Sequence, residues 1–214
     1  MHYPTGGLGD QLAHAGRAVV QAGLVVGSGG NLSARAPGAD ECWVTAAGTW
    51  LDRLDRGSFV RIRISDGAAL DNIVGAAPSS ELALHLATYR ARPDVNAVVH
   101  LHPQSVLLLD AIGEPIRLVT TDHAFYLRRI ATVPFVPPGR PEVGTLAAEA
   151  CADGTDCVVL SRHGCSVVAG SVELAHKRAF YLEEAARLTY RALLLGRPLE
   201  PLPTGWLAGP GATA

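Results

Sequence analysis

The apolar run from Val95 to His102 constrains the fold of this chain more than any other stretch. Its valines favour a buried strand, and Pro103 ends the run. Because side chains alternate between the two faces of a strand, residues two apart point the same way. His100 and His102 are therefore predicted to face one point. Neutral imidazoles presented in this way suit a divalent metal such as zinc, whose open sites have three protein ligands.

A third ligand must come from a distant part of the chain, and His163 is our candidate. It lies in the stretch from Cys157 to Val168, which is typical of two buried strands that meet at a tight turn near Gly164. Such a turn would expose the imidazole. Cys165 is a possible fourth ligand, although a buried thiol without a metal is the simpler interpretation.

The other patterns predict helices at both ends of the chain and short strands between them. We expect helices over residues 9–26, 78–90, 104–111, 144–152 and 172–195, and strands over 42–45, 59–64, 116–119 and 131–134. Asp66-Gly67 is predicted to form a hairpin turn. This order favours a three-layer α/β fold, in which a central mixed, largely antiparallel sheet is flanked by helices. The glycine-rich stretch 27–33 follows a helix and lacks Gly-x-Gly-x-x-Gly, which argues against a Rossmann unit.

Length and composition predict a single domain over residues 1–214, with an irregular tail from about residue 198. The net charge of −2 gives no reason to expect nucleic acid or an anionic membrane as a partner. Every apolar run is interrupted well before the length of a membrane span, and the first residues lack the apolar core of a signal peptide. Four scattered cysteines indicate reduced thiols, so we expect a cytoplasmic protein.

Three segments offer backbone N–H groups and hydroxyls to an anion. They are Gly29-Gly30-Asn31 with Ser33, the stretch from Thr45 to Thr49 around Gly48, and Ser79-Ser80. Glycine lets the backbone approach an anion closely. A helix that starts with Ser79 or Ser80 as its N-cap adds a partial positive charge. Together the segments predict a phosphate site that requires no Lys or Arg.

Glu81, expected in the first turn of that helix, is the candidate for proton transfer. Partial burial near a metal would raise its pKa toward neutrality, which suits an acid or base. The ordinary alternative is a carboxylate that only stabilises the start of the helix. An anion pocket, a Lewis acid and a carboxylate base together are typical of carbon–carbon cleavage next to a carbonyl.

Five short motifs follow one another along the chain: Gly30-Asn31-Leu32-Ser33, Thr45-Ala46-Ala47-Gly48, Pro78-Ser79-Ser80-Glu81, His100-Leu101-His102 and Arg162-His163-Gly164. This ordered set resembles the class II aldolase/adducin-like family. The resemblance covers roughly residues 8–195. Within the family, the nearest group is similar to the L-fuculose-phosphate aldolases.

The resemblance implies one zinc ion per subunit, held by His100, His102 and His163, with Glu81 as the proton-transferring carboxylate. It assigns the substrate phosphate to Gly30, Asn31, Gly48, Ser79 and Ser80. It also implies a C4 homotetramer with active sites between subunits. The implied reaction cleaves a ketose 1-phosphate to dihydroxyacetone phosphate and an aldehyde through a metal-stabilised enediolate. Fuculose 1-phosphate and a 5-deoxy or 5-substituted pentulose 1-phosphate are equally plausible substrates.

Two departures from the family pattern leave parts of this reading open. Ala47 stands where the family usually has Thr or Ser, so one phosphate hydroxyl is missing, and Thr45 or Thr49 is a candidate replacement. The family's mid-chain Tyr, contributed by a neighbouring subunit, has no clear counterpart here, and His123 and Tyr126 are the candidates. The alternatives are a sugar-phosphate 4-epimerase, a keto-acid phosphate decarboxylase and a non-catalytic adducin-like interaction module. Asp122 precedes His123 instead of following it, which counts against an epimerase.

Overall fold

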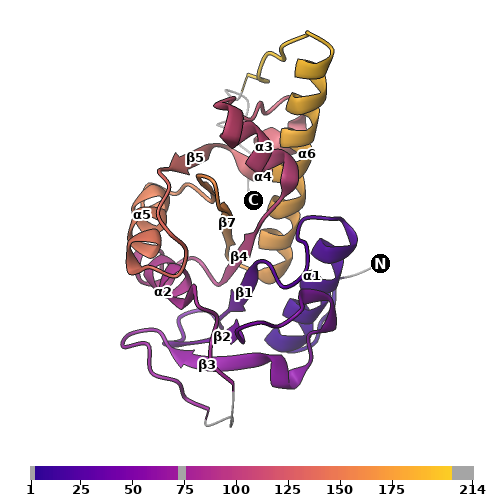
Figure 1. Ribbon diagram of the computed structural model, residues 1–214. Helices are drawn as coiled ribbons and strands as arrows, with labels where there is room; N and C mark the ends of the chain where they lie inside the picture. Colours follow the sequence, from indigo (N-terminus) through magenta and orange to yellow (C-terminus); the bar gives the residue numbers. More distant parts are fainter. Residues whose placement is uncertain (1–2, 72–75, 204–214) are drawn as a thin grey trace, which may run out of the picture.

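The computed structural model describes residues 3–71 and 76–203, and within these ranges the chain forms one seven-stranded sheet between two layers of helices (Figure 1). The strand order is β3-β2-β1-β4-β7-β6-β5, and every neighbouring pair is antiparallel except β5 and β6. The strands are β1 (Asn31–Ala34), β2 (Glu41–Thr45), β3 (Phe59–Arg63), β4 (Ala97–Leu101), β5 (Ile130–Val133), β6 (Cys157–Leu160) and β7 (Gly164–Ala169). The predicted mixed, largely antiparallel α/β fold is confirmed.

The helices divide between the two faces of the sheet. One layer contains α1, α3, α4 and α6, and the other contains α2 and α5 (Figure 1). Their bounds are α1 (Leu8–Gln21), α2 (Leu82–Ala91), α3 (Gln104–Ile112), α4 (Thr121–Leu127), α5 (Pro141–Cys151) and α6 (Val172–Leu194), with short 3₁₀ turns at Leu51–Arg53 and Arg56–Ser58. In the described part of the chain, none of the helices is both long and apolar enough to span a bilayer.

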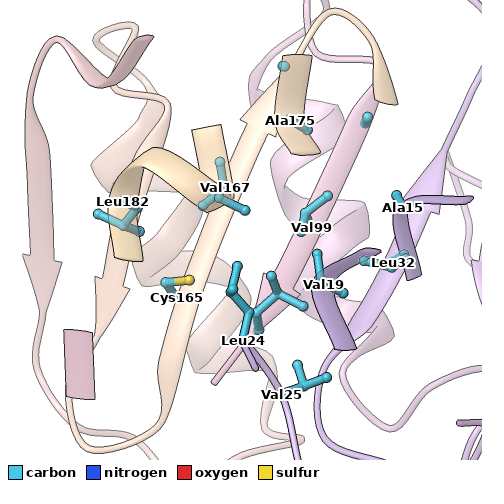
Figure 2. Packing of buried hydrophobic residues seen from close by; sticks show 14 of the residues in the cluster. Ala15, Val19, Leu24, Val25, Leu32, Val99, Cys165, Val167, Ala175 and Leu182 are labelled. Atoms are coloured by element: carbon cyan, nitrogen blue, oxygen red, sulfur yellow. The ribbon is translucent and has the colours of Figure 1, made fainter. Parts of the chain in front are cut away.

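Side chains alternate between the two faces of each central strand, so each face of the sheet has its own apolar core. Val99 of β4 packs toward α1 and α6, together with Leu32, Val167 and Leu182 (Figure 2). Val98, one residue earlier, belongs to the opposite core against α2 and α5. Because residues two apart share a face, His100 lies on the same face as Val98. The α2/α5 face of the sheet is therefore the face that carries the predicted metal ligands.

Two expectations about local structure need correction, and one helix was not expected. The first helix ends at Gln21 and not near residue 26, because Gly23 takes a left-handed φ of +73° and turns the chain so that Leu24 enters the core. Residues 116–119 form no strand: the Arg117 N–H donates to Thr189 on α6. Helix α4 was not predicted. Residues 197–203 are irregular, and the rest of the predicted tail lies outside the described residues.

Candidate metal and substrate site

Three histidines from two separate segments converge on the α2/α5 face of the sheet. His100 is in β4, His102 follows directly after that strand, and His163 lies in the tight turn between β6 and β7. The Nε2 atoms of His100 and His102 are 2.9 Å apart, and the His163 ring centre lies 4.8 Å from that of His100. The strand geometry and the pairing of β4 with β7 bring these side chains together.

The turn that carries His163 is held in place by a carboxylate from helix α3. Arg162 has a left-handed φ of +59°, which is costly for a residue other than glycine. The Arg162 N–H donates to Asp110 of α3 at 2.8 Å, and the Ser161 hydroxyl lies 3.2 Å from the same oxygen. These contacts stabilise the strained residue directly before the imidazole.

Glu81 completes the cluster. Its Oε2 lies 2.9 Å from His100 Nε2, and its Oε1 lies 3.1 Å from His163 Nε2. One donor atom from each of Glu81, His100, His102 and His163 lies within 4.8 Å of the others. Glu81 is the N-cap residue of α2, so it precedes the first turn in which we expected it. Neither Ser79 nor Ser80, the two expected caps, is the N-cap, and the Ser79 hydroxyl instead accepts a hydrogen bond from the Glu81 N–H at 3.2 Å.

The donor set fits a divalent cation. His100 Nδ1 lies 3.0 Å from the Cys165 carbonyl, to which it donates, so Nε2 is the ring nitrogen that would bind a metal. An outer partner of this kind is typical of metal-binding histidines. Three imidazole nitrogens and a carboxylate oxygen suit zinc and similar borderline metals. The Cys165 sulfur packs in the core on the opposite face, beside Val167 and Leu182 (Figure 2), and is not a member of the cluster.

The pKa of Glu81 differs from our expectation. Burial alone would raise it, but hydrogen bonds to His100 and His163 and their charge outweigh burial and hold the pKa below its usual range. The carboxyl is therefore ionised at neutral pH. Burial and the two neighbouring imidazoles lower the pKa of His102 to about 4. That imidazole stays neutral near pH 7, which is the form that binds a metal.

A cavity of about 280 Å³ opens beside the cluster. Its wall contains Ser28 to Asn31, Ala46 to Thr49, Ser79 to Glu81, Pro138, His102 and His163. The fold thus brings together the three segments that we proposed for an anion. Gly30 has a φ of +75°, and a Cβ there would lie 2.6 Å from the His100 carbonyl, so the close approach requires glycine. Among the described residues of this wall there is no Lys or Arg.

Four of the proposed residues lie away from this cavity. Ser33 is fully buried, and its hydroxyl is bonded to His85 and Tyr89 instead of facing the cavity. Thr45 is buried, and its hydroxyl accepts from the Leu32 N–H at 3.1 Å, whereas Thr49 is on the wall. His123 is buried in α4, with Nε2 3.4 Å from Glu184. Tyr126 stacks on Tyr181 of α6 with ring centres 4.6 Å apart. Within a single subunit, His123 and Tyr126 do not contribute to the wall.

His85 and Tyr89 of α2 are two further residues of the site, and neither was expected from the sequence. Asn31 donates to Glu81 Oε2 at 3.0 Å, and its Oδ1 lies 2.5 Å from His85 Nε2. Burial, followed by the charge of His100, lowers the pKa of His85 to about 3, so this imidazole is neutral. The spacing Glu81-x-x-x-His85-x-x-x-Tyr89 was the available signal, because residues four apart share one face of a helix.

Comparison with known proteins shows the family and the fold that this chain shares. The family described as the class II aldolase and adducin N-terminal domain matches residues 10–190. The L-fuculose phosphate aldolase of Methanocaldococcus jannaschii is 32% identical over 171 residues, which cover 80% of this chain and 89% of that protein. The 3-oxo-tetronate 4-phosphate decarboxylase of Escherichia coli K12 is 31% identical over 206 residues, covering 94% and 93%. The crystal structure of YgbL from Escherichia coli has a TM-score of 0.81 at 30% identity, covering 94% and 96%.

Proposed function

Because this chain belongs to the class II aldolase and adducin family, we propose that it is a zinc-dependent aldolase that cleaves a ketose 1-phosphate to dihydroxyacetone phosphate and an aldehyde. The observation that carries this proposal is the position of Glu81. Its carboxylate lies between two imidazoles of a three-histidine cluster and on the wall of a cavity built from anion-binding segments. A base, a metal site and a phosphate pocket thus meet at one point.

His100, His102 and His163 are the residues that would hold one zinc ion per subunit. When bound there, the metal supplies a Lewis acid that polarises the substrate carbonyl. The Ser79 and Ser80 hydroxyls, with backbone N–H groups around Gly30 and Gly48, would bind the phosphate. The side chain of Asn31 is already committed to Glu81 and His85, so it is the backbone of Asn31 that we assign to the phosphate.

Glu81 would transfer the proton at the carbon next to the carbonyl. In the cleavage direction the bond between C3 and C4 breaks, and its electron pair stays on C3 as the enediolate of dihydroxyacetone phosphate. The C4 hydroxyl gives up its proton to a base and becomes the aldehyde. The Glu81 carboxylate takes up a proton from solvent and transfers it to C3, while the base that accepted the C4 proton releases that proton to solvent. For the C4 proton we propose His123 or Tyr126 from a neighbouring subunit.

A decarboxylase is the second candidate, because relatives with that name match over more of the chain. The Escherichia coli decarboxylase aligns with 94% of this sequence, against 80% for the Methanocaldococcus aldolase. Loss of carbon dioxide from a 3-oxo-tetronate 4-phosphate leaves the same enediolate that the aldol cleavage leaves. Glu81 would protonate it in the same way. The two reactions differ in the leaving group, which a neighbouring subunit would contact.

We also propose a homotetramer with sites completed between subunits, as the family resemblance implies. The support is that His123 and Tyr126, candidates for the missing base, lie outside the cavity of their own chain. Helix α6 beside them lines a larger cavity of about 610 Å³, with Phe180 and Tyr181 on its wall. A neighbouring subunit is our proposed occupant of this surface. The four buried free cysteines support the proposed cytoplasmic location.

Product trapping with the zinc-loaded protein tests these proposals. The panel should contain fuculose 1-phosphate, 5-deoxy and 5-substituted pentulose 1-phosphates, pentulose phosphates and a 3-oxo-tetronate 4-phosphate. Dihydroxyacetone phosphate together with an aldehyde supports the aldolase, and released carbon dioxide supports the decarboxylase. An interconverted pentose phosphate would mean an epimerase. No turnover across the panel, with zinc bound, would favour a non-catalytic adducin-like module.

A further inference from the structure

A chain of buried hydrogen bonds runs from Glu81 into the interior, away from the cavity. Asn31 and Ser33, two apart on β1, face Glu81, His85 and Tyr89, which are four apart along α2. The links are Glu81 Oε2 to Asn31 Nδ2 (3.0 Å), Asn31 Oδ1 to His85 Nε2 (2.5 Å), His85 Nδ1 to Ser33 Oγ (2.6 Å) and Ser33 Oγ to Tyr89 Oη (2.7 Å). All five side chains are at most 8% exposed.

Only one arrangement of protons gives every one of these hydrogen bonds a donor and an acceptor. Asn31 presents its NH₂ group to Glu81 Oε2 and its carbonyl oxygen to His85 Nε2, and an amide oxygen can only accept. His85 must therefore carry its proton on Nε2 and accept at Nδ1 from the Ser33 hydroxyl. Ser33 in turn accepts from the Tyr89 hydroxyl. Every donor points toward the carboxylate, and each link fixes the orientation of the next.

The series of hydrogen bonds does not lead to solvent. Tyr89 is 1% exposed, and the Arg35 guanidinium lies 4.9 Å from its ring centre. A proton that travelled from Glu81 along these groups would reach a buried phenol with no exit. The arrangement therefore suits orientation of the carboxylate, and not the delivery of protons to it.

We propose that His85 is a positioning residue, which acts through Asn31 to fix the orientation of the Glu81 carboxylate. The inference rests on the role in proton transfer proposed above for Glu81. Without the Nε2–H donor, the Asn31 carbonyl oxygen is buried without a partner, and the amide is no longer held at both ends in the position that donates to Glu81. The carboxylate would then lose its only side-chain donor among the described residues other than the clustered imidazoles.

Two conservative variants separate the two nitrogens of His85. In His85→Gln the side-chain amide reaches the place of Nε2 and can still donate to Asn31. In His85→Asn the amide reaches only the place of Nδ1, keeps the contact with Ser33 and loses the donor to Asn31. We expect kcat to fall about tenfold or more in His85→Asn, as for loss of a hydrogen bond to a charged group, and to recover largely in His85→Gln. KM and zinc content should stay at wild-type values in both.

Equal losses of kcat in the two variants, at matched melting temperature, would show a merely structural role and overturn the proposal. A readout without turnover keeps the inference separate from the proposed reaction. Nitrogen-15 NMR of the zinc-loaded wild-type protein should show His85 as the neutral Nε2–H form. It should also show Asn31 side-chain amide signals that persist in His85→Gln and change in His85→Asn. An Nδ1–H or charged His85 would overturn the proposal. If these spectra are observed but the protein turns over no substrate, the series of hydrogen bonds from Glu81 to Tyr89 is supported. Only the proposed reaction is then contradicted.

Discussion

Asn31 lies directly opposite His100 where β1 pairs with β4 in the antiparallel sheet. The residue that donates to Glu81 and the first metal-ligand candidate are therefore fixed to one another by backbone register. Glu81 Oε2 contacts both side chains, at 3.0 Å from Asn31 Nδ2 and 2.9 Å from His100 Nε2. Because neighbouring strands of a sheet move little relative to one another, Asn31 and His100 keep their relative position, and Glu81 contacts both of them.

The first prediction concerns metal content. Elemental analysis of the purified protein should find about one zinc per chain, the ratio for a single three-histidine site. His102→Ala should bind substantially less zinc, because it removes one of three nitrogen ligands. His14→Ala is the matched control, since His14 packs against Tyr3 and His176 away from the cluster. A chelator should lower the melting temperature of the wild type, because the ion binds only the folded state. Full activity of a metal-free preparation would contradict this prediction.

The second prediction concerns Glu81→Gln, which keeps the shape of the side chain and removes its ability to titrate. Turnover should fall at least about a hundredfold, the low end of the effect of a general acid or base. Exchange of dihydroxyacetone phosphate protons with solvent, followed by NMR, should slow as well, because it reports enediolate formation without the aldehyde. Zinc content and the melting temperature serve as controls. If the variant exchanges at the wild-type rate, Glu81 is not the base, and His123 and Tyr126 become the candidates.

The third prediction concerns Gly164, directly after the third histidine. A Cβ there would meet the Leu101 carbonyl oxygen and lie 2.7 Å from the His102 ring. Gly164→Ala should therefore displace His102 and lower zinc affinity by about 10- to 100-fold, the range for disturbed support of a metal ligand. Gly170→Ala is the control, because its Cβ would make only an ordinary contact of 3.6 Å with the Asp94 carbonyl. Competition with a zinc-sensitive dye measures the zinc affinity of both variants. Equal zinc affinities of Gly164→Ala and Gly170→Ala would refute the steric argument.

The fourth prediction concerns acid stability. The pKa of His85 is about 3 in the folded protein, against about 6.5 in an unfolded chain. A depressed folded pKa means that the unfolded state binds the proton first, so the stabilisation is complete above about pH 6.5 and declines as pH falls toward the folded value. In that window His85 should contribute a loss of about 1.4 kcal/mol of unfolding free energy per pH unit. Urea unfolding with a chelator at pH 7, 6 and 5 should show a shallower loss for His85→Gln. Parallel curves for wild type and variant would argue against a buried neutral imidazole.

Local pattern predicted most of the sheet, because strand alternation and hairpin turns depend on neighbouring residues. Arg63 and Gly67 close the predicted turn after β3 through a 2.8 Å hydrogen bond. The strand expected over residues 116–119 failed for a tertiary reason. Its Ile-Arg-Leu-Val alternation is typical of a strand, but the backbone N–H of Arg117 is satisfied by Thr189 of α6. Helix α4 is short and mixed in polarity, so it left no periodic signal.

The parts of the site that depend only on the spacing of residues along the chain could be predicted. His100 and His102 share a face on any strand, and the turn before Gly164 was visible in the sequence. The direction of the Glu81 pKa was not predictable, because it depends on two imidazoles at 2.9 and 3.1 Å outweighing burial. His85 was missed for a similar reason. Its spacing from Glu81 is visible, but the strand that faces this side of α2 is known only from the structure.

The position of the β6–β7 turn has a consequence for how the protein acquires its metal. Strand β7 lies between β4 and β6 in the sheet, although it follows both in the chain. A growing chain therefore presents His100 and His102 long before His163, and the triad closes only when β7 is inserted. Pairings between segments distant in sequence form slowly in folding. During refolding, tight zinc capture should thus coincide with the last step of sheet assembly and report the moment at which the central strands have joined.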